Sequence, residues 1–334
     1  MRDNEDATEN RMQTSSLLIC SDIHYASDAE KARGRFELDA IEQPLARMFI
    51  KMYRHFFWLR DPFAHNELMR HVLEPSLTPD IVVANGDFSC DSGFIGVADE
   101  PSKESAAICL GRLRQRYGSK FHGVYGDHEL GKVTLAGGKG GLRLESLRVA
   151  KEELGLQPFW ELEVGKYRFI AITSTLVAMP VYQHEALPEE RAQWIELSRE
   201  HISRINEAFG SVKPDEKVIL FCHDPTALPF LLEVPELKKR LGQIEKTVIG
   251  HLHSNLIVWQ SRILSGLPHI QGMGAGVKRM SAALSKAKEW RHFNLLLCPS
   301  LSGIELLRRG GFYMVEIDPS GKRGLVFRKR SFRR

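Results

Sequence analysis

Two histidines separated by one residue mark the stretch at 248–254, which reads Val-Ile-Gly-His-Leu-His-Ser. Imidazole nitrogen is a good ligand for zinc, iron and other divalent transition metals. Because side chains alternate along an extended chain, His251 and His253 would point to the same side at the end of a strand. The spacing therefore predicts that both histidines bind the same metal ion. Histidine pairs in loops are more often simply solvated, so this prediction needs further ligands elsewhere in the chain.

Further acidic and histidine residues follow other apolar runs of the sequence. The runs are predicted to be buried strands, at 17–20, 80–84, 121–125, 217–221 and around 247. The polar residues after them are, in chain order, Asp22 and His24, Asp87, Asp127 and His128, His223, and His251 and His253. Strands that alternate with helices build sheets whose ligands bind beyond the carboxyl ends of the strands. One polar strand end is unremarkable, but five in a row predict a shared site at one edge.

In this order the five blocks resemble the calcineurin-like metallophosphoesterases, over residues 17 to 255. The blocks are Asp22-x-His24, Gly86-Asp87, Gly126-Asp127-His128-Glu129, His223 and Gly250-His251-x-His253. The resemblance implies an α/β (α+β) fold, a two-layered β-sandwich flanked by helices. It also implies two divalent metal ions, Mn²⁺, Fe²⁺/Fe³⁺ or Zn²⁺, at the loop edge. It assigns ligands as follows: Asp22, His24 and His253 to one ion, Asp127, His223 and His251 to the other, and Asp87 to both.

The chemistry implied by the resemblance is hydrolysis of a phosphodiester or a pyrophosphate. Two ions held by one carboxylate lower the pKa of a shared water and neutralise the phosphoryl oxygens. His128 matches the histidine that faces the leaving group, where it can donate a proton. The alternative is a non-catalytic scaffold of the same fold that binds a protein partner. The intact set of ligand positions together with His128 favours the enzyme.

Asp127 departs from the usual pattern of this block, which reads Gly-Asn-His. An aspartate still binds a cation, and as an anion it does so more strongly than an amide. Counting only the ligands, the ions and a hydroxide, aspartate leaves the centre near neutral, whereas asparagine would leave one positive charge. We expect from this count tighter metal binding, a less acidified water and a preference for diesters over monoesters.

Composition and length indicate one large globular unit. The chain has 334 residues, of which 43% are hydrophobic, and a net charge of +4. We expect a flexible N-terminal tail over 1–15 and a single domain over 16–334. The five cysteines show no paired spacing, and the first residues lack a secretory signal. These features favour a reducing, cytoplasmic location.

A helical insertion is expected at about 35–76, after the first strand. Apolar and aromatic residues at helical spacing, from Leu45 to Phe56, give one face of a helix. A second helix is expected around 65–73. The aromatic face of the 45–58 segment either packs on the sheet or caps the site, or it contacts lipid at a membrane surface. A large amphiphilic phosphodiester or pyrophosphate would suit such a lid, and nucleic-acid substrates stay open. The sequence does not define the oligomeric state.

Overall fold

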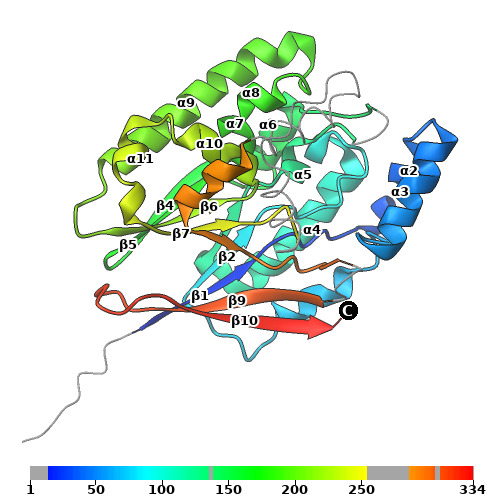
Figure 1. The fold of residues 1–334 in the computed structure, drawn as a ribbon. Helices are drawn as coiled ribbons and strands as arrows, with labels where there is room; N and C mark the ends of the chain where they lie inside the picture. Colours follow the sequence, from blue (N-terminus) through cyan, green and yellow to red (C-terminus); the bar gives the residue numbers. More distant parts are fainter. Residues whose placement is uncertain (1–13, 135–137, 254–285, 305–308, 334) are drawn as a thin grey trace, which may run out of the picture.

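The apolar runs of the sequence become strands of two five-stranded sheets in the computed structural model of the chain (Figure 1). The structure describes residues 14–134, 138–253, 286–304 and 309–333. The first sheet has the order β10-β9-β1-β2-β3. Its strands are β1 Ser15–Cys20, β2 Ile81–Asn85, β3 Phe121–Val124, β9 Arg309–Ile317 and β10 Val326–Arg333. The second sheet has the order β4-β5-β6-β7-β8. Its strands are β4 Phe159–Val164, β5 Tyr167–Ile172, β6 Lys217–Cys222, β7 Ile244–Ile249 and β8 Leu295–Leu297.

Both sheets are mixed. In the first, β1 pairs in parallel with β2 and antiparallel with β9. In the second, β5, β6, β7 and β8 run parallel to one another, and β4 is an edge strand that pairs antiparallel with β5. The carboxyl ends of the parallel strands therefore gather at one edge, where polar residues follow them. This is the edge that the sequence predicted.

The two sheets pack against each other through alternate residues of their strands. Leu17 and Ile19 of β1 share one apolar cluster with Phe169 of β5 and Phe221 of β6. The residues between them in sequence, such as Leu18 of β1, face the other way and join a cluster that includes helical residues. Because both faces of these strands are covered, they are apolar throughout rather than alternating. The chain thus folds as the expected β-sandwich flanked by helices.

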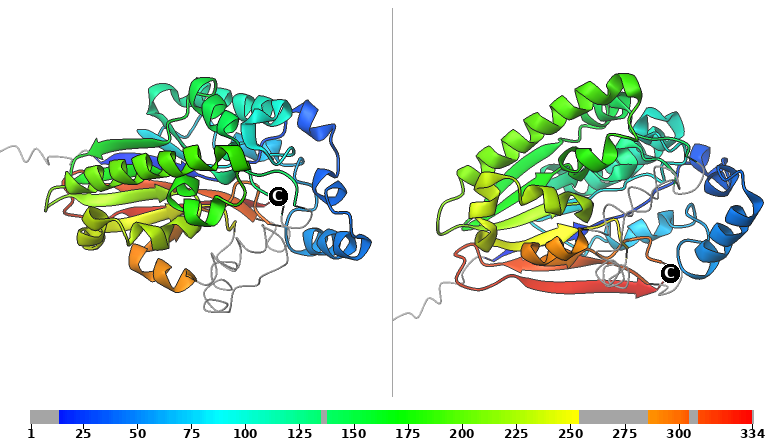
Figure 2. Two further views of the ribbon diagram at one scale, coloured as in Figure 1. Left: turned by 90° about the horizontal axis from the view of Figure 1, so that it is seen from above. Right: turned by 45° about the horizontal axis from the view of Figure 1, so that its top comes forward.

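Helices cover the outer faces of the sandwich (Figure 2). The four longest are α3 Pro44–Phe56, α4 Glu100–Tyr117, α6 Leu144–Glu152 and α9 Arg191–Gly210. The short ones are α1 Asp28–Lys31, α2 Phe36–Asp39, α5 Asp127–Leu130, α7 Ser174–Val177, α8 Met179–Tyr182, α10 Leu228–Leu231 and α11 Pro235–Lys239. Among the described helices, none combines the length and the apolar character needed to cross a membrane.

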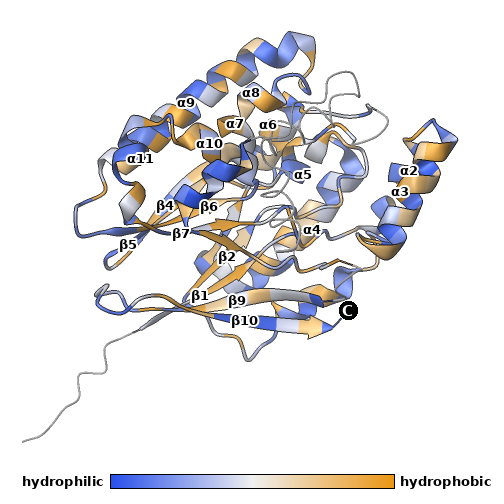
Figure 3. Cartoon of the chain, in the orientation of Figure 1, coloured by the Kyte–Doolittle hydropathy of each residue, from blue (hydrophilic) through white to orange (hydrophobic). Residues whose placement is uncertain are grey.

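The segment between β1 and β2 is helical, as expected. Helix α3 begins at Pro44, a favourable residue for the first helical turn, and a short 3-10 helix at Asn66–His71 takes the place of the second expected helix. The apolar face of α3 does not pack on the sheet. Met48, Phe49 and Phe56 on that face are exposed, and the buried residue of the helix is Arg54. Figure 3 shows hydrophobic residues along α3, at the periphery of the molecule. The second segment does contribute to the core through Met69, and capping of the site or lipid contact by the exposed face of α3 stays a prediction.

The N-terminal tail is shorter than expected. Ser15 already belongs to β1, where it pairs with Ile317 of β9. The strand therefore begins at the last residue of the predicted tail. Residues 1–13, which form most of the predicted tail, lie outside the described residues. The assignment of 16–334 to a single domain stays a prediction.

Candidate metal centre

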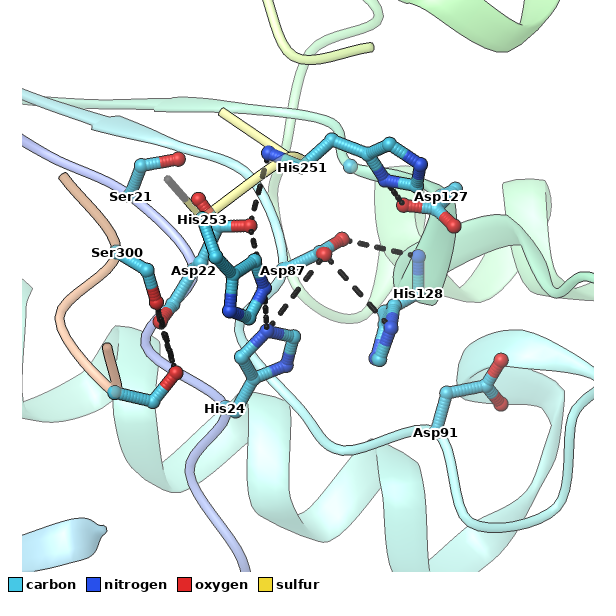
Figure 4. Close-up of polar contacts among 12 residues, drawn as sticks. Ser21, Asp22, His24, Asp87, Asp91, Asp127, His128, His251, His253 and Ser300 are labelled. Atoms are coloured by element: carbon cyan, nitrogen blue, oxygen red, sulfur yellow. Dashed lines mark hydrogen bonds and ion pairs between the residues drawn. The ribbon is translucent and has the colours of Figure 1, made fainter. Parts of the chain in front are cut away.

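The structure brings all eight predicted site residues together at the loop edge of the sandwich (Figure 4). The carboxylate of Asp87, which follows β2, lies at the centre. Its Oδ2 atom is 3.9 Å from Nε2 of His24, 3.2 Å from Nε2 of His223 and 3.8 Å from Nε2 of His128. Segments that are far apart in the sequence therefore meet around one buried acid.

The side chains form overlapping groups in which the potential ligand atoms lie within 4.8 Å of one another. One group is Asp22, His24 and His253, a second is Asp87, Asp127, His223 and His251, and a third is His24, Asp87 and His128. The first two groups, with Asp87 reaching both, have the same membership as the two ligand sets implied by the sequence resemblance. The role of each residue stays a prediction.

His251 and His253 do not share one ion-sized space, contrary to the prediction from their spacing. The Nδ1 atom of His251 lies 3.0 Å from Oδ1 of Asp127, whereas Nε2 of His253 lies 3.2 Å from Oδ1 of Asp22. Both histidines follow β7 rather than belong to it, and their φ angles are 60° and 53°. The left-handed backbone breaks the period-two alternation of a strand, so the two rings enter different groups.

Unusual backbone conformations concentrate at this edge. The residues with left-handed φ between 48° and 60° include Asp22, His24, Asp87, His251 and His253. Such a conformation costs about 1–3 kcal/mol for a residue other than glycine and is kept where the surrounding structure enforces it. Two glycines allow the loops to approach. A Cβ at Gly86 would lie 2.5 Å from Nδ1 of His223, and one at Gly126 would overlap the carboxylate of Asp87.

Backbone carbonyls orient four of the imidazoles. Each carbonyl accepts from an Nδ1 atom: Ser89 from His24 (3.3 Å) and from His128 (3.0 Å), Gly303 from His253 (3.2 Å), and Asn85 from His223. A carbonyl partner requires the proton on Nδ1, so the Nε2 lone pair is directed into the site. This outer support fixes the tautomer and the ring orientation that a metal ligand needs. None of these carbonyls carries a side-chain signal, so the sequence could not reveal them.

The sequence profile of the calcineurin-like phosphoesterases matches residues 15–255 of the chain. The chain belongs to this family. The matched range contains the five strand-end blocks. The family implies divalent metal ions, and the structure brings together Asp and His groups that could hold a metal.

Two solved structures resemble this phosphoesterase at low identity. One is a phosphopantetheinyl hydrolase from Mycobacterium tuberculosis, with 16% identity, a TM-score of 0.36 and coverage of 72% of this chain and 84% of that chain. The other is described as a 5'-nucleotidase from Staphylococcus aureus, with 12% identity, a TM-score of 0.38 and coverage of 96% of this chain and 54% of that chain. This chain thus spans about half the length of the second protein. At this level neither likeness bears on the substrate. No curated protein matches the chain in sequence.

The donor set of the phosphoesterase fits divalent cations. Asp22, Asp87 and Asp127 are buried, at 0%, 1% and 1% exposure, and together they concentrate negative charge. Burial would lower the pKa of His223, yet the carboxylate of Asp87 raises it well above its usual range. In the described part of the chain, Oδ2 of Asp22 and Nε2 of His223 are buried without a hydrogen-bond partner. Buried carboxylate oxygens, together with an imidazole that the negative field keeps protonated, suit a divalent metal, which would take the place of that proton.

His128 and Glu129 of the same block behave differently. Burial lowers the pKa of His128 to about 4, so its ring is neutral near pH 7. Its backbone N–H donates to Oδ1 of Asp87 at 3.2 Å. Glu129, which the sequence did not assign to the site, accepts from the backbone N–H groups of Gly126, Asp87 and Phe88 at 2.7, 3.0 and 2.8 Å. Glu129 therefore holds the two loops that carry Asp87 and Asp127 against each other.

Two further residues lie at the site, and one of them belongs to the 45–58 segment that was expected to pack on the sheet, cap the site or contact lipid. The indole of Trp58, from the segment after α3, lies against the ring of His253 with their centroids 4.6 Å apart. The ammonium of Lys132 lies 2.7 Å from Oδ2 of Asp127. Trp58 brings the helical segment between β1 and β2 to the site. Lys132 adds a positive charge that the charge count made from the sequence left out.

Proposed function

We propose that this phosphoesterase hydrolyses a phosphodiester or a pyrophosphate at the centre around Asp87. The observation that carries the proposal is the position of the Asp87 carboxylate between two groups of buried acids and imidazoles. A carboxylate in such a place can touch two cations at once, which is the arrangement used for in-line displacement at phosphorus.

The residues would take the following roles. Asp22, His24 and His253 hold one divalent ion, Asp127, His223 and His251 hold a second, and Asp87 contacts both. Mn²⁺, iron and Zn²⁺ all suit this mixture of carboxylate and imidazole ligands. When bound, the ions supply an acidified water and neutralise charge on the phosphoryl group. The chain supplies a rigid cradle, since backbone carbonyls and Glu129 fix the loops on which the ligands lie.

His128 would serve the leaving group. Its Nδ1–H donates to the carbonyl of Ser89 at 3.0 Å, so Nε2 faces the space beside Asp87. Because its Nδ1–H is used by Ser89 and the ring is neutral near pH 7, Nε2 would have to take up a proton beside the bound phosphate before His128 could pass one to the departing oxygen.

The surroundings of Asp87 favour a substrate whose phosphorus carries two substituents, one on each side of the site. His128 and His253 lie on opposite sides of the Asp87 carboxylate (Figure 4). Beside His253 the indole of Trp58 offers an apolar surface on which a substituent can stack. A diester or a pyrophosphate presents one group to each side, whereas a monoester presents only one.

We also propose that the apolar face of α3 rests on a lipid surface, which makes the protein peripheral to a membrane. Its large side chains are Leu45, Met48, Phe49, Met52, Tyr53, Phe56 and Phe57, and each is between 39% and 77% exposed. The guanidinium of Arg54, on the opposite side, is buried and pairs with Glu37, so the helix is held with its apolar face outward. The chain runs directly from this face to Trp58 at the centre, which suits an amphiphilic phosphoester.

Hydrolysis of two model esters tests the enzymatic proposal. With Mn²⁺, we expect the protein to cleave bis-(p-nitrophenyl) phosphate faster than p-nitrophenyl phosphate, and Asp87→Asn to lose both activities by at least about 100-fold. A higher rate on the monoester contradicts the substrate class. If neither ester is cleaved while the protein binds Mn²⁺, the non-catalytic scaffold with a protein partner becomes the better explanation.

A further inference from the structure

Lys132 follows the short helix α5 and is turned back onto its first residue. Gly131 ends the helix with φ of 90°, and its N–H donates to the carbonyl of Asp127 at 3.0 Å. On the other side the N–H of Val133 donates to Glu185 at 2.9 Å. Because the backbone is tied down on both sides of Lys132, its side chain is directed towards Asp127.

The two carboxylate oxygens of Asp127 have different neighbours. Oδ1 lies 3.0 Å from Nδ1 of His251 and 3.5 Å from Nε2 of His223, so it faces the ligand group. Oδ2 lies 2.7 Å from the ammonium of Lys132. An asparagine here would have only one oxygen. If that oxygen faced the imidazoles, the amide NH₂ group would face the ammonium; if it faced the ammonium, the NH₂ group would face the imidazoles. Lys132 is therefore compatible with aspartate at this position and poorly compatible with asparagine.

The charges of the pair cancel. The carboxylates of Asp22, Asp87 and Asp127 together carry three negative charges, and the ammonium of Lys132 reduces the net charge of the group to −2. An asparagine in place of Asp127, without the lysine, would leave two carboxylates and the same sum of −2. The near-neutral centre expected from the sequence therefore does not follow once Lys132 is counted.

We propose that Asp127 and Lys132 form a charge-balanced pair, in which Asp127 contributes an anionic ligand while Lys132, as a positioning residue, restores the positive field that attracts a phosphate anion. This inference rests on the proposed function, because it concerns the same centre. Lys132 is 23% exposed at its side chain and Asp127 is 1% exposed, so the pair lies where solvent reaches the ammonium but not the carboxylate. In such a place a unit charge is only partly screened.

Binding of inorganic phosphate to the Mn²⁺-saturated protein tests the pair without relying on activity. We expect Lys132→Met to raise the phosphate Kd about tenfold, the scale of one partly screened unit charge. The double variant Asp127→Asn with Lys132→Met should return to within about threefold of the natural chain, and so should Lys132→Arg, which keeps the charge. Lys238→Met, at an exposed lysine of α11, is the matched control and should leave the Kd unchanged.

Calorimetry gives the phosphate Kd and, in a separate titration, the Mn²⁺ stoichiometry of each variant. If the double variant binds phosphate as weakly as Lys132→Met, the lysine contacts the anion directly and charge balance is wrong. If Lys132→Met leaves the Kd within twofold, or Lys132→Arg is as weak as Lys132→Met, the inference is also overturned. If the natural chain binds phosphate but the variants give one of these contradicting results, only the charge-balance inference fails and the proposed function is unaffected. Failure of the natural chain to bind any of Mn²⁺, Fe²⁺ and Zn²⁺ removes both.

Discussion

His128 differs from the other imidazoles of the centre in its surroundings. Its ring faces His24 with centroids 4.7 Å apart, and it belongs to the group with His24 and Asp87 but to neither of the groups that contain Asp22 or Asp127. A residue in this place can act on the leaving group without holding an ion. The distinction can be measured, because loss of a proton donor and loss of a ligand have different consequences.

Replacement of His128 by asparagine should separate these two roles. We expect kcat for bis-(p-nitrophenyl) phosphate to fall by roughly 10²–10⁴-fold, the usual contribution of a positioned acid, while the Mn²⁺ content stays as in the natural chain. Steady-state kinetics and metal analysis of the same preparation measure both. A variant that loses metal together with activity would show that His128 is a ligand.

At the scale of elements, α3 is the exception to the rule that a helix buries its apolar stripe. In Figure 1 it lies at the periphery, beside α2, and its large apolar side chains are exposed. Seven large apolar side chains on one exposed face are more than scattered surface residues and mark an interaction site.

Co-sedimentation with vesicles of phosphatidylcholine and phosphatidylglycerol tests the lipid contact. Burying one phenylalanine side chain is worth about 1.5–3 kcal/mol, so Phe49→Asp combined with Phe56→Asp should lower the partition coefficient at least about tenfold. Val326→Asp, at an exposed apolar residue of β10, is the matched control and should bind as the natural chain does. If the double variant binds the vesicles as well as the natural chain does, the proposed lipid contact of α3 is wrong. If the double change instead turns a dimer into a monomer, the face joins two copies of the chain.

The contact between α9 and the end of β5 makes a second prediction at this scale, through His201. Its Nε2 accepts the backbone N–H of Thr173 at 3.1 Å, and burial lowers its pKa to about 3 from an ordinary value near 6.5. The folded chain therefore binds this proton less readily than the unfolded chain. The stabilising contribution is complete above pH 6.5 and is lost as the pH falls from there towards 3.

Chemical denaturation at a series of pH values measures this effect. Between pH 6 and 4 the free energy of unfolding of the natural chain should fall more steeply than that of His201→Gln, by up to about 1.4 kcal/mol per pH unit. Glutamine offers an oxygen to Thr173 but does not titrate. Equal slopes for the two proteins would mean that His201 is protonated as easily in the folded chain as in the unfolded one.

At the scale of the whole molecule, the sequence was most informative where chemistry and topology coincide. Apolar runs that end in Asp or His predicted both the sheets and the edge at which they meet, because parallel strands expose their carboxyl ends together. The sequence was least informative where the backbone conformation determines the direction of a side chain. The separation of His251 from His253 depends on left-handed φ angles, and no spacing rule for strands predicts it.

Contacts across long sequence distances explain the remaining gaps. Trp58 and Lys132 reach the centre only because a helical segment and a glycine turn bring them there. The outward face of α3 was one of the alternatives that the sequence left open, because an apolar stripe at helical spacing normally predicts a buried face but also suits a lipid contact. The burial of Arg54 on the other side of this helix can be seen only in the folded molecule.

Calorimetric titration of the metal-free protein with Mn²⁺ tests the central claim most directly, namely that Asp87 lies between two ions. We predict two ions per chain for the natural protein and weaker binding of both ions in Asp87→Ala, since one carboxylate serves both places. A stoichiometry of one ion, or an Asp87→Ala variant that loses affinity at a single site only, would contradict the account.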